Sequence, residues 1–142
     1  MRYVIDTSVL VSALRSKNGA SHLVLRRVYD GQLPIVMHYK LLSEYRDVLA
    51  RPEMKAKLVY SETEIERLLA VLVARAEEVT VRYLWRPNLR DEKDNFLLEI
   101  AVAAQPCTIV THNARDFITG ELRFSSVPIK RPQDILLEGF HS

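Results

Sequence analysis

Short apolar runs along the chain alternate with segments in which apolar residues recur every three to four positions. The runs are rich in β-branched residues and predict strands, whereas the longer spacing predicts amphipathic helices. The predicted strands span 3–5, 34–38, 79–81, 108–111 and 127–129. The predicted helices span 9–14, 20–29, 39–51, 61 through 73, 96–104, 114–118 and 132–139. Because strands alternate with helices, we expect an α/β fold with three layers (α/β/α) and a central, mostly parallel sheet of four to five strands.

Residues with known preferences at helix ends mark several of these boundaries. Ser61 and Glu64 have the spacing of a capping box, which opens the long fourth helix. Gly31 suits the end of the second helix, and Pro52 bounds the third. Pro132 stands at the first position of the last helix, where proline is tolerated.

Length and composition are those of one globular domain, which we expect to span 1–142. Apolar residues make up 48% and charged residues 27% of the chain, as in ordinary soluble proteins. The one cysteine, Cys107, excludes an intramolecular disulfide and fits a reducing compartment. No basic leader precedes an apolar stretch, and no apolar run approaches the ~20 residues of a membrane span. We therefore expect a cytoplasmic protein with no membrane segment.

Two acidic residues are placed where catalytic groups are common. Asp6 directly follows the first predicted strand, and ligands of open α/β sheets bind at the carboxyl ends of strands. Glu44 lies at the edge of the apolar face of the predicted helix 39–51. A carboxylate beside a buried stripe loses hydration unless something compensates. The alternative for Glu44 is a side chain that simply extends into solvent.

Two further acids are candidates for the same site, although each could instead have a purely structural role at a helix start. Asp94 stands at or just before the amino end of the predicted helix 96–104, which is apolar on nearly every side. Asp91 and Asp94 have the spacing of a capping pair, so either acid could cap that helix. Asp116 follows the fourth strand by a short turn, where the helix dipole alone would favour an aspartate.

Together the four acids predict a metal site. A right-handed, doubly wound topology brings Asp6, Glu44, Asp94 and Asp116 toward one crevice. Clustered carboxylates repel one another, and a divalent cation stabilises them. Oxygen ligands alone favour Mg²⁺ or Mn²⁺ over zinc. Such a cation activates water and neutralises a phosphoryl oxygen, which are the requirements of phosphodiester hydrolysis.

The balance of charge bears on the partner of such a site. The net charge of +2 is mild, but removing four acids from the 18 Asp and Glu leaves 14 against 20 Lys and Arg, or +6. An acidic pocket in a basic surround suits an anionic polymer. An ordinary solvated surface is the alternative.

The ordered set of motifs resembles a known family. Asp6-Thr7-Ser8, Lys93-Asp94-Asn95-Phe96-Leu97 and Thr111-His112-Asn113-Ala114-Arg115-Asp116-Phe117, with Glu44 between the first two, resemble the PIN domain, named after the PilT N-terminus. The closer likeness is to the VapC-type toxin nucleases of prokaryotic toxin–antitoxin pairs, from Met1 to about Leu136. It implies that the four acids hold Mg²⁺ or Mn²⁺ for RNA cleavage. It also implies a homodimer and a small antitoxin protein that blocks the site.

Several other residues are candidates for supporting roles. The resemblance matches Ser8 to a hydroxyl that orients a carboxylate or water. Asn113 could share the role of Asp116 by binding a metal-bound water, and Asp91 is an extra acid beside the site or a cap. The candidates for contact with the RNA backbone are Arg86, Arg90, Lys93 and Arg115, with a solvated basic loop as the alternative.

Aromatic and histidine side chains complete the candidates. Tyr83 and Trp85 could stack on a base, although packing against the sheet or a subunit is the more usual role of such residues. His38 and His112 both follow strands, and we interpret them as polar residues at strand ends rather than as metal ligands.

Two other functions compete with a nuclease. A phosphatase acting through an aspartyl-phosphate, as in haloacid-dehalogenase-like enzymes, needs a second Asp two residues after the nucleophile. Ser8 occupies that position here. The non-enzymatic alternative is a catalytically degenerate dimer of the same fold that binds RNA or protein.

Overall fold

The computed structural model describes residues 1–81, 92–115 and 127–138, and for 92–95 it describes the backbone alone. The elements in chain order are β1 (Arg2–Ile5), α1 (Thr7–Arg15), α2 (Ala20–Tyr29), β2 (Val36–Met37), α3 (Tyr39–Ala50), α4 (Pro52–Lys55), α5 (Glu62–Arg75), β3 (Glu77–Glu78), α6 (Glu92–Ala103), β4 (Cys107–Val110), β5 (Ile129–Lys130) and α8 (Pro132–Glu138).

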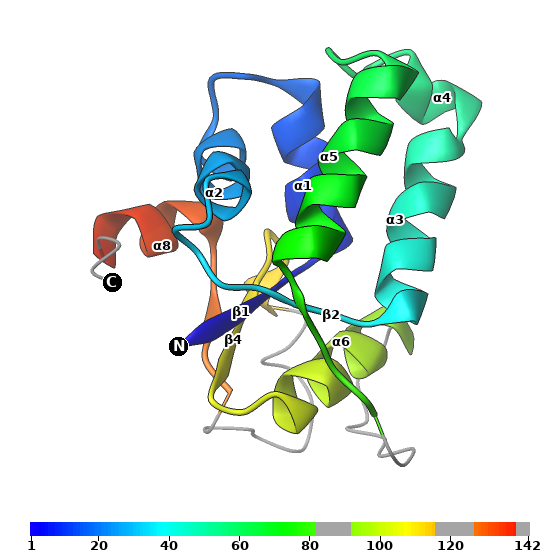
Figure 1. Cartoon of the computed structure of the whole chain (residues 1–142). Helices are drawn as coiled ribbons and strands as arrows, with labels where there is room; N and C mark the ends of the chain where they lie inside the picture. Colours follow the sequence, from blue (N-terminus) through cyan, green and yellow to red (C-terminus); the bar gives the residue numbers. More distant parts are fainter. Residues whose placement is uncertain (82–91, 116–126, 139–142) are drawn as a thin grey trace.

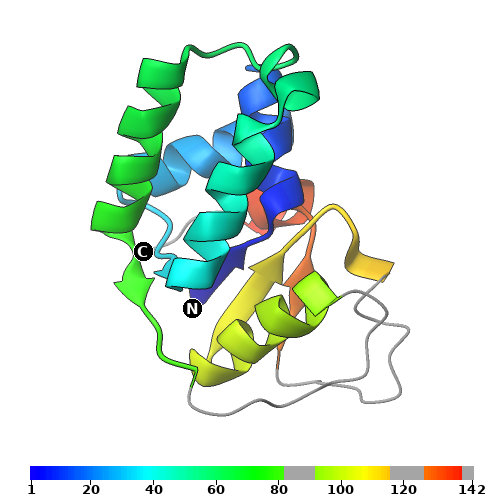
Figure 2. The ribbon, with the colours of Figure 1, turned by 90° about the vertical axis from the view of Figure 1, so that its right-hand side faces the viewer.

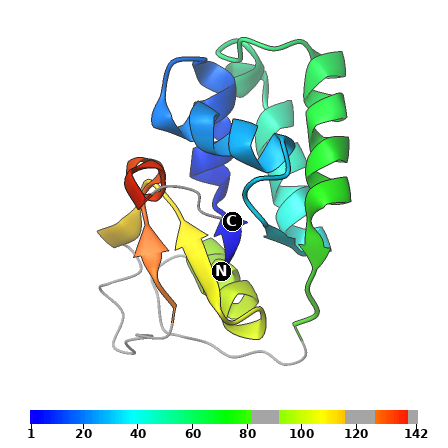
Figure 3. The ribbon, with the colours of Figure 1, turned by 60° about the vertical axis from the view of Figure 1, so that its left-hand side comes forward.

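All the strand pairings in the described residues are parallel. β4 lies between β1 and β5, and β2 pairs with β3. A parallel bridge between Tyr3 and Ile35 connects the two groups, so the strands follow the order β3-β2-β1-β4-β5 (Figure 3). The mostly parallel sheet predicted from the alternation of strands and helices is confirmed.

Helices cover both faces of these strands. Helix α6 packs on β4 and β1, below the strands in Figure 1. On the other side, α2 packs against α1, α5 and α8, and α1 also packs against α3. Figure 2 shows the same separation after a quarter turn of the molecule. The three-layer arrangement predicted from the sequence is therefore present.

The core is continuous between the layers. Its largest fully buried side chains include Tyr45, Leu10, Leu98 and Ile109, which come from α3, α1, α6 and β4. Glu99 of α6 is also buried, with 4% of its surface exposed, in a helix otherwise rich in apolar residues. This packing holds the ends of β1 and β4 in fixed positions, which matters for the residues that follow them.

Two predicted boundaries are wrong, each because polar residues carry no apolar pattern. The third strand is Glu77–Glu78 rather than 79–81, although Val79 N still donates to Met37 O at 2.9 Å. Both glutamates are exposed at the sheet edge, where a strand does not need apolar side chains. Helix α6 begins at Glu92 rather than at 96, since its first turn is polar.

Pro52 bounds the third helix, as predicted. It also begins the short helix α4, which the sequence analysis did not predict. Proline is well suited to the first position of a helix, so one residue acts as both a stop and a start.

Candidate functional site

Asp6 lies at the junction of β1 and α1, and its carboxylate bonds to side chains rather than to the backbone of the helix. Its backbone N donates to Val110 O at 2.9 Å, which continues the pairing with β4. Asp6 occupies the N-cap position of α1, yet its side chain accepts no capping hydrogen bond. Instead Oδ2 accepts from Ser8 Oγ at 2.9 Å and from Thr111 Oγ1 at 2.6 Å. Two hydroxyl groups therefore determine how the carboxylate is oriented.

Glu44 is brought to the same junction by α3. Its Oε2 accepts a hydrogen bond from Thr7 Oγ1 at 2.8 Å, and the side chain is half-buried. The alternative of a side chain extended into solvent is therefore not what the structure contains. Thr7 follows Asp6 directly, so the two carboxylates flank one backbone segment.

The buried side chain of Tyr45 links α3 to β1. Its hydroxyl donates to Ile5 O, the carbonyl that precedes Asp6. Burial raises the pKa of Tyr45 well above 10, and the negative charges of Asp6 and Glu44 raise it further. The phenol therefore stays protonated and remains a donor. The sequence analysis gave no role of their own to Tyr45, Thr7 and Thr111. Thr7 and Tyr45 each stand next to a predicted acid, which was their only local signal, whereas Thr111 has no acid beside it in the sequence.

The end of β4 supplies the other side of the junction. Thr111 is fully buried and its Oγ1 also accepts from Asn113 N at 3.0 Å. His112 N lies 3.4 Å from Ser8 Oγ, and its ring Nε2 lies 2.7 Å from Ser21 Oγ. Asn113 is exposed next to these groups. The structure thus brings Asp6, Ser8 and Glu44 together beside Asn113.

The other predicted site residues are described only in part. Asp94 is the third residue of α6, so it lies within the first helical turn rather than at or just before the helix start. Its side chain and that of Lys93 lie outside what is described. Arg115 is exposed at the end of the described segment 92–115. The remaining candidates, Asp91, Asp116, Arg86 and Arg90, lie outside the described residues, as do Tyr83 and Trp85.

The acidic side chains at the junction are of the type that binds a hard divalent cation. Asp6 and Glu44 offer oxygen atoms only, which is the ligand type of Mg²⁺ and Mn²⁺. Within the described residues, no three His, Cys, Asp or Glu side chains are grouped closely enough to hold a metal. The two acids therefore fit such an ion as half of the predicted set, and the roles of all four remain predictions.

His38 and Cys107 have structural roles. His38 Nδ1 accepts from Lys40 N at 3.1 Å and caps α3, as expected of a polar residue at a strand end. Burial lowers the pKa of His38, and the charge of Lys40 lowers it further. Cys107 begins β4 with no exposed surface, and burial raises its pKa to about 12.

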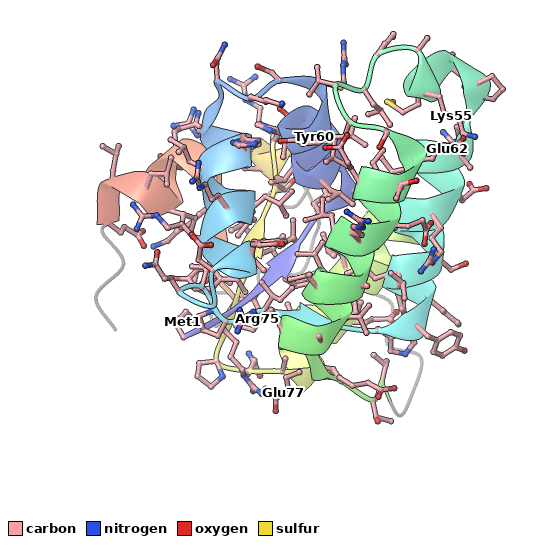
Figure 4. The ribbon with its side chains drawn as sticks, turned by 45° about the horizontal axis from the view of Figure 1, so that its top comes forward. Met1, Lys55, Tyr60, Glu62, Arg75 and Glu77 are labelled. Carbon is pink, nitrogen blue, oxygen red and sulfur yellow. The ribbon has the colours of Figure 1, made fainter. Side chains whose placement is uncertain are left out.

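Two surface cavities lie away from this junction. One, of about 380 Å³, is lined by α1, α2 and α5 residues including His22 and Arg67, and a second, of about 460 Å³, lies between α3, α4 and α5. Tyr60 lines both, and Figure 4 shows it near the start of α5, where Lys55 and Glu62 form an ion pair. Neither cavity includes Asp6 or Glu44. Among the described helices, none has the length and apolar character needed to cross a membrane.

Comparison with known proteins agrees with this architecture. A family model described as "PIN domain" matches residues 2–115. The crystal structure of VapBC2 from Rickettsia felis bound to a DNA fragment from their promoter is similar in fold, with a TM-score of 0.59 and 16% identity. That match covers 92% of this chain and 98% of the other. No curated protein matches. Because the family model covers most of the chain, from the first strand to the end of β4, the protein belongs to the PIN domain family.

Proposed function

We propose that the protein is a metal-dependent endoribonuclease, the toxin of a type II toxin–antitoxin pair, that hydrolyses RNA phosphodiester bonds. The observation that carries this proposal is the pair of hydroxyl-oriented carboxylates, Asp6 and Glu44, at the carboxyl edge of a parallel sheet in a PIN domain. Ligands of open α/β sheets bind at that edge.

Four residues would hold Mg²⁺ or Mn²⁺, namely Asp6, Glu44, Asp94 and Asp116. Bound there, the cation would supply an activated water and neutralise charge on the scissile phosphate. Ser8 and Thr111 keep Asp6 in one orientation, and both donate to Oδ2, so Oδ1 is the oxygen that we expect to face the ion. Asn113 stands beside Thr111, where its amide can orient a water.

The remaining partners follow from charge and from the family. Arg86, Arg90, Lys93 and Arg115 are our candidates for the RNA backbone, with +6 of charge outside the four acids. The solved structure of similar fold is a VapBC2 complex, which supports a cognate antitoxin for this chain also. We further propose one domain over 1–142, a homodimer and a cytoplasmic location.

The experiment compares acid variants in an RNA cleavage assay. We expect Asp6→Asn, Glu44→Gln and Asp94→Asn to lower the rate at least 100-fold in Mg²⁺, since each removes a ligand charge. Glu53→Gln is the control, because Glu53 is an exposed acid of α4. Cleavage at the wild-type rate by Asp94→Asn would contradict the proposal.

Calorimetric titration with Mn²⁺ separates the enzyme from the catalytically degenerate alternative. An active nuclease binds the ion, and Asp6→Asn weakens this binding. If the wild-type protein bound no Mn²⁺, a dimeric module that binds RNA or protein would be favoured.

A further inference from the structure

One aromatic ring near the acids is exposed although it is held on one side. Tyr39 is the first residue of α3, and 68% of its surface is exposed. Its ring stacks on His38 with the ring centroids 4.6 Å apart and the planes inclined by 29°. Tyr39 therefore has one face against a neighbouring ring and the rest of its surface open to solvent.

The ring beneath Tyr39 is fixed by the core. His38 has 8% of its surface exposed, and Phe96 of α6 meets its ring edge-on at 5.1 Å. The Nδ1 of His38 is engaged by Lys40 N. Burial and Lys40 lower the pKa of His38, so its ring is neutral at pH 7. Tyr39 thus rests on a rigid, uncharged support.

A positive charge stands beside this stack. The Nζ of Lys40 lies 5.6 Å from the centre of the Phe96 ring, and Lys40 is exposed. The cation is therefore attracted to an aromatic face while remaining accessible to an anion. We call Tyr39, His38, Phe96 and Lys40 the aromatic platform.

Helix α3 places the platform near the acids. Tyr39 and Lys40 open this helix, and Glu44 follows Tyr39 by five residues, which is about 7.5 Å along the helix axis. Glu44 Oε2 accepts a hydrogen bond from Thr7 Oγ1, next to Asp6. The platform therefore begins little more than one helical turn from the proposed metal ligand Glu44.

We propose that Tyr39 stacks on an unpaired base of single-stranded RNA and that Lys40 contacts a phosphate of the same strand. The inference rests on the proposed nuclease function and assigns a nucleotide-binding subsite beside its acids. Stacking on an aromatic ring tolerates any base, because every base has a π face. A base inside a duplex is already stacked and is not available to Tyr39, which makes the subsite selective for unpaired RNA.

The test measures binding without cleavage. In an Asp6→Asn background with EDTA, fluorescence anisotropy compares a labelled single-stranded RNA octamer with an octamer of the same backbone that lacks all bases. We expect Tyr39→Ala to weaken binding of the octamer with bases about 5- to 150-fold. It should leave the abasic octamer unaffected, whereas Tyr39→Phe and Tyr39→Trp should keep both affinities.

Control variants separate stacking from charge and from folding. Tyr29→Ala removes another exposed tyrosine, on α2, and should change neither affinity. Lys40→Ala should weaken both octamers alike and reduce the salt dependence of binding by about one charge. Tyr39→Leu keeps apolar bulk without a π face, so it replaces Tyr39→Ala if the alanine variant does not fold.

The outcomes distinguish this inference from the proposed function. Equal effects of the Tyr39 variants on both octamers, or no effect on either, would overturn the base-stacking subsite even if the wild-type protein cleaves RNA. Conversely, a base-dependent loss of binding in a protein that cleaves no RNA would overturn the nuclease and leave the subsite in place.

Discussion

Three hydroxyl groups orient the carboxylates of Asp6 and Glu44 at the junction of β1 and α1. Ser8 and Thr111 donate to Asp6, and Thr7 donates to Glu44. A hydrogen bond to a charged group contributes about 1.5–3 kcal/mol. Each of these bonds also restricts the rotation of its carboxylate, so the acids are pre-oriented before any ligand arrives.

Replacing Thr111 by Val tests this orientation with little change of volume. Groups that support metal ligands typically change metal affinity 10- to 100-fold when they are removed, and we expect a loss in this range for Mn²⁺. The free energy of unfolding should fall by about 1–3 kcal/mol, since a charge-assisted hydrogen bond is lost.

Thr108→Val is the matched control, because Thr108 is a buried threonine of β4, the strand that Thr111 follows, and pairs with Tyr3 rather than with an acid. Calorimetry measures the affinities, and urea titration measures the stabilities. Equal effects of the two substitutions would show that the Thr111 hydroxyl does not orient Asp6.

Because the thiol of Cys107 is buried, we expect the free energy of unfolding to depend on pH in the alkaline range. Its pKa rises from 9.0 to about 12 on burial, so the unfolded chain releases the thiol proton first. Stability from the neutral thiol is therefore complete below pH 9 and declines between pH 9 and 12, by at most about 1.4 kcal/mol per pH unit.

Urea titrations of the wild type and Cys107→Ala across this range isolate the effect, because other groups titrate equally in both. The wild type should lose stability more steeply than the variant as pH rises. Parallel curves would mean that the thiol ionises equally in the folded and unfolded chains.

At the scale of elements, helix α2 ends in a way that only one residue type accommodates easily. Gly31 follows the C-cap Asp30 with φ of 77°, and a Cβ there would lie 3.0 Å from Arg75 Nη1. An L side chain in this left-handed conformation costs about 1–2 kcal/mol. Gly31→Ala should therefore lower the melting temperature by about 3–8 °C.

Gly31→Asn is the comparison, because asparagine tolerates the left-handed region better than alanine does. We expect the asparagine variant to melt between the wild type and the alanine variant in a calorimetric scan. Identical melting of both variants would attribute the loss to the contact with Arg75 instead of to the backbone.

The elements that the sequence predicted well have local signals. Residues 20–29 match α2 exactly in extent, and the capping box at Ser61 and Glu64 is present with both of its hydrogen bonds. The edge strand β3 and the first turn of α6 were not predicted, because they consist of polar residues. An apolar pattern reports burial, so it cannot find structure that lies at a surface.

Of the candidate site, the sequence predicted the acids and the hydroxyl of Ser8, but not the threonines that also bind the acids. Asp6 and Glu44 were identified because each stands at a recognisable place in a strand or helix. The bond between Thr111 and Asp6 joins residues 105 positions apart, and no local pattern specifies such a pair. Partners of this kind become visible only when the sheet register is known.

For the molecule as a whole, the proposed metal should act as a stabilising ligand. At a Mn²⁺ concentration 100 times the dissociation constant, the folded state gains about 2.7 kcal/mol. For a chain of 142 residues we expect the melting temperature to rise by about 5–10 °C. EDTA should reverse the shift and abolish RNA cleavage together.

Asp6→Asn supplies the control for this measurement, since it removes a proposed ligand at a half-buried position. Its melting temperature should not respond to Mn²⁺. A rise as large as that of the wild type would place the ion elsewhere on the protein.

The pairing of β1 with β4 has a consequence for how the protein is made. Arg2 of β1 pairs with Cys107 of β4, so β1 cannot pair with β4 until translation has passed residue 107. At about 5–20 residues per second, a nascent chain waits roughly 5–20 s for that neighbour. Throughout this interval Asp6 lacks the hydrogen bond from the Thr111 hydroxyl, so its carboxylate is not yet held as it is in the folded protein.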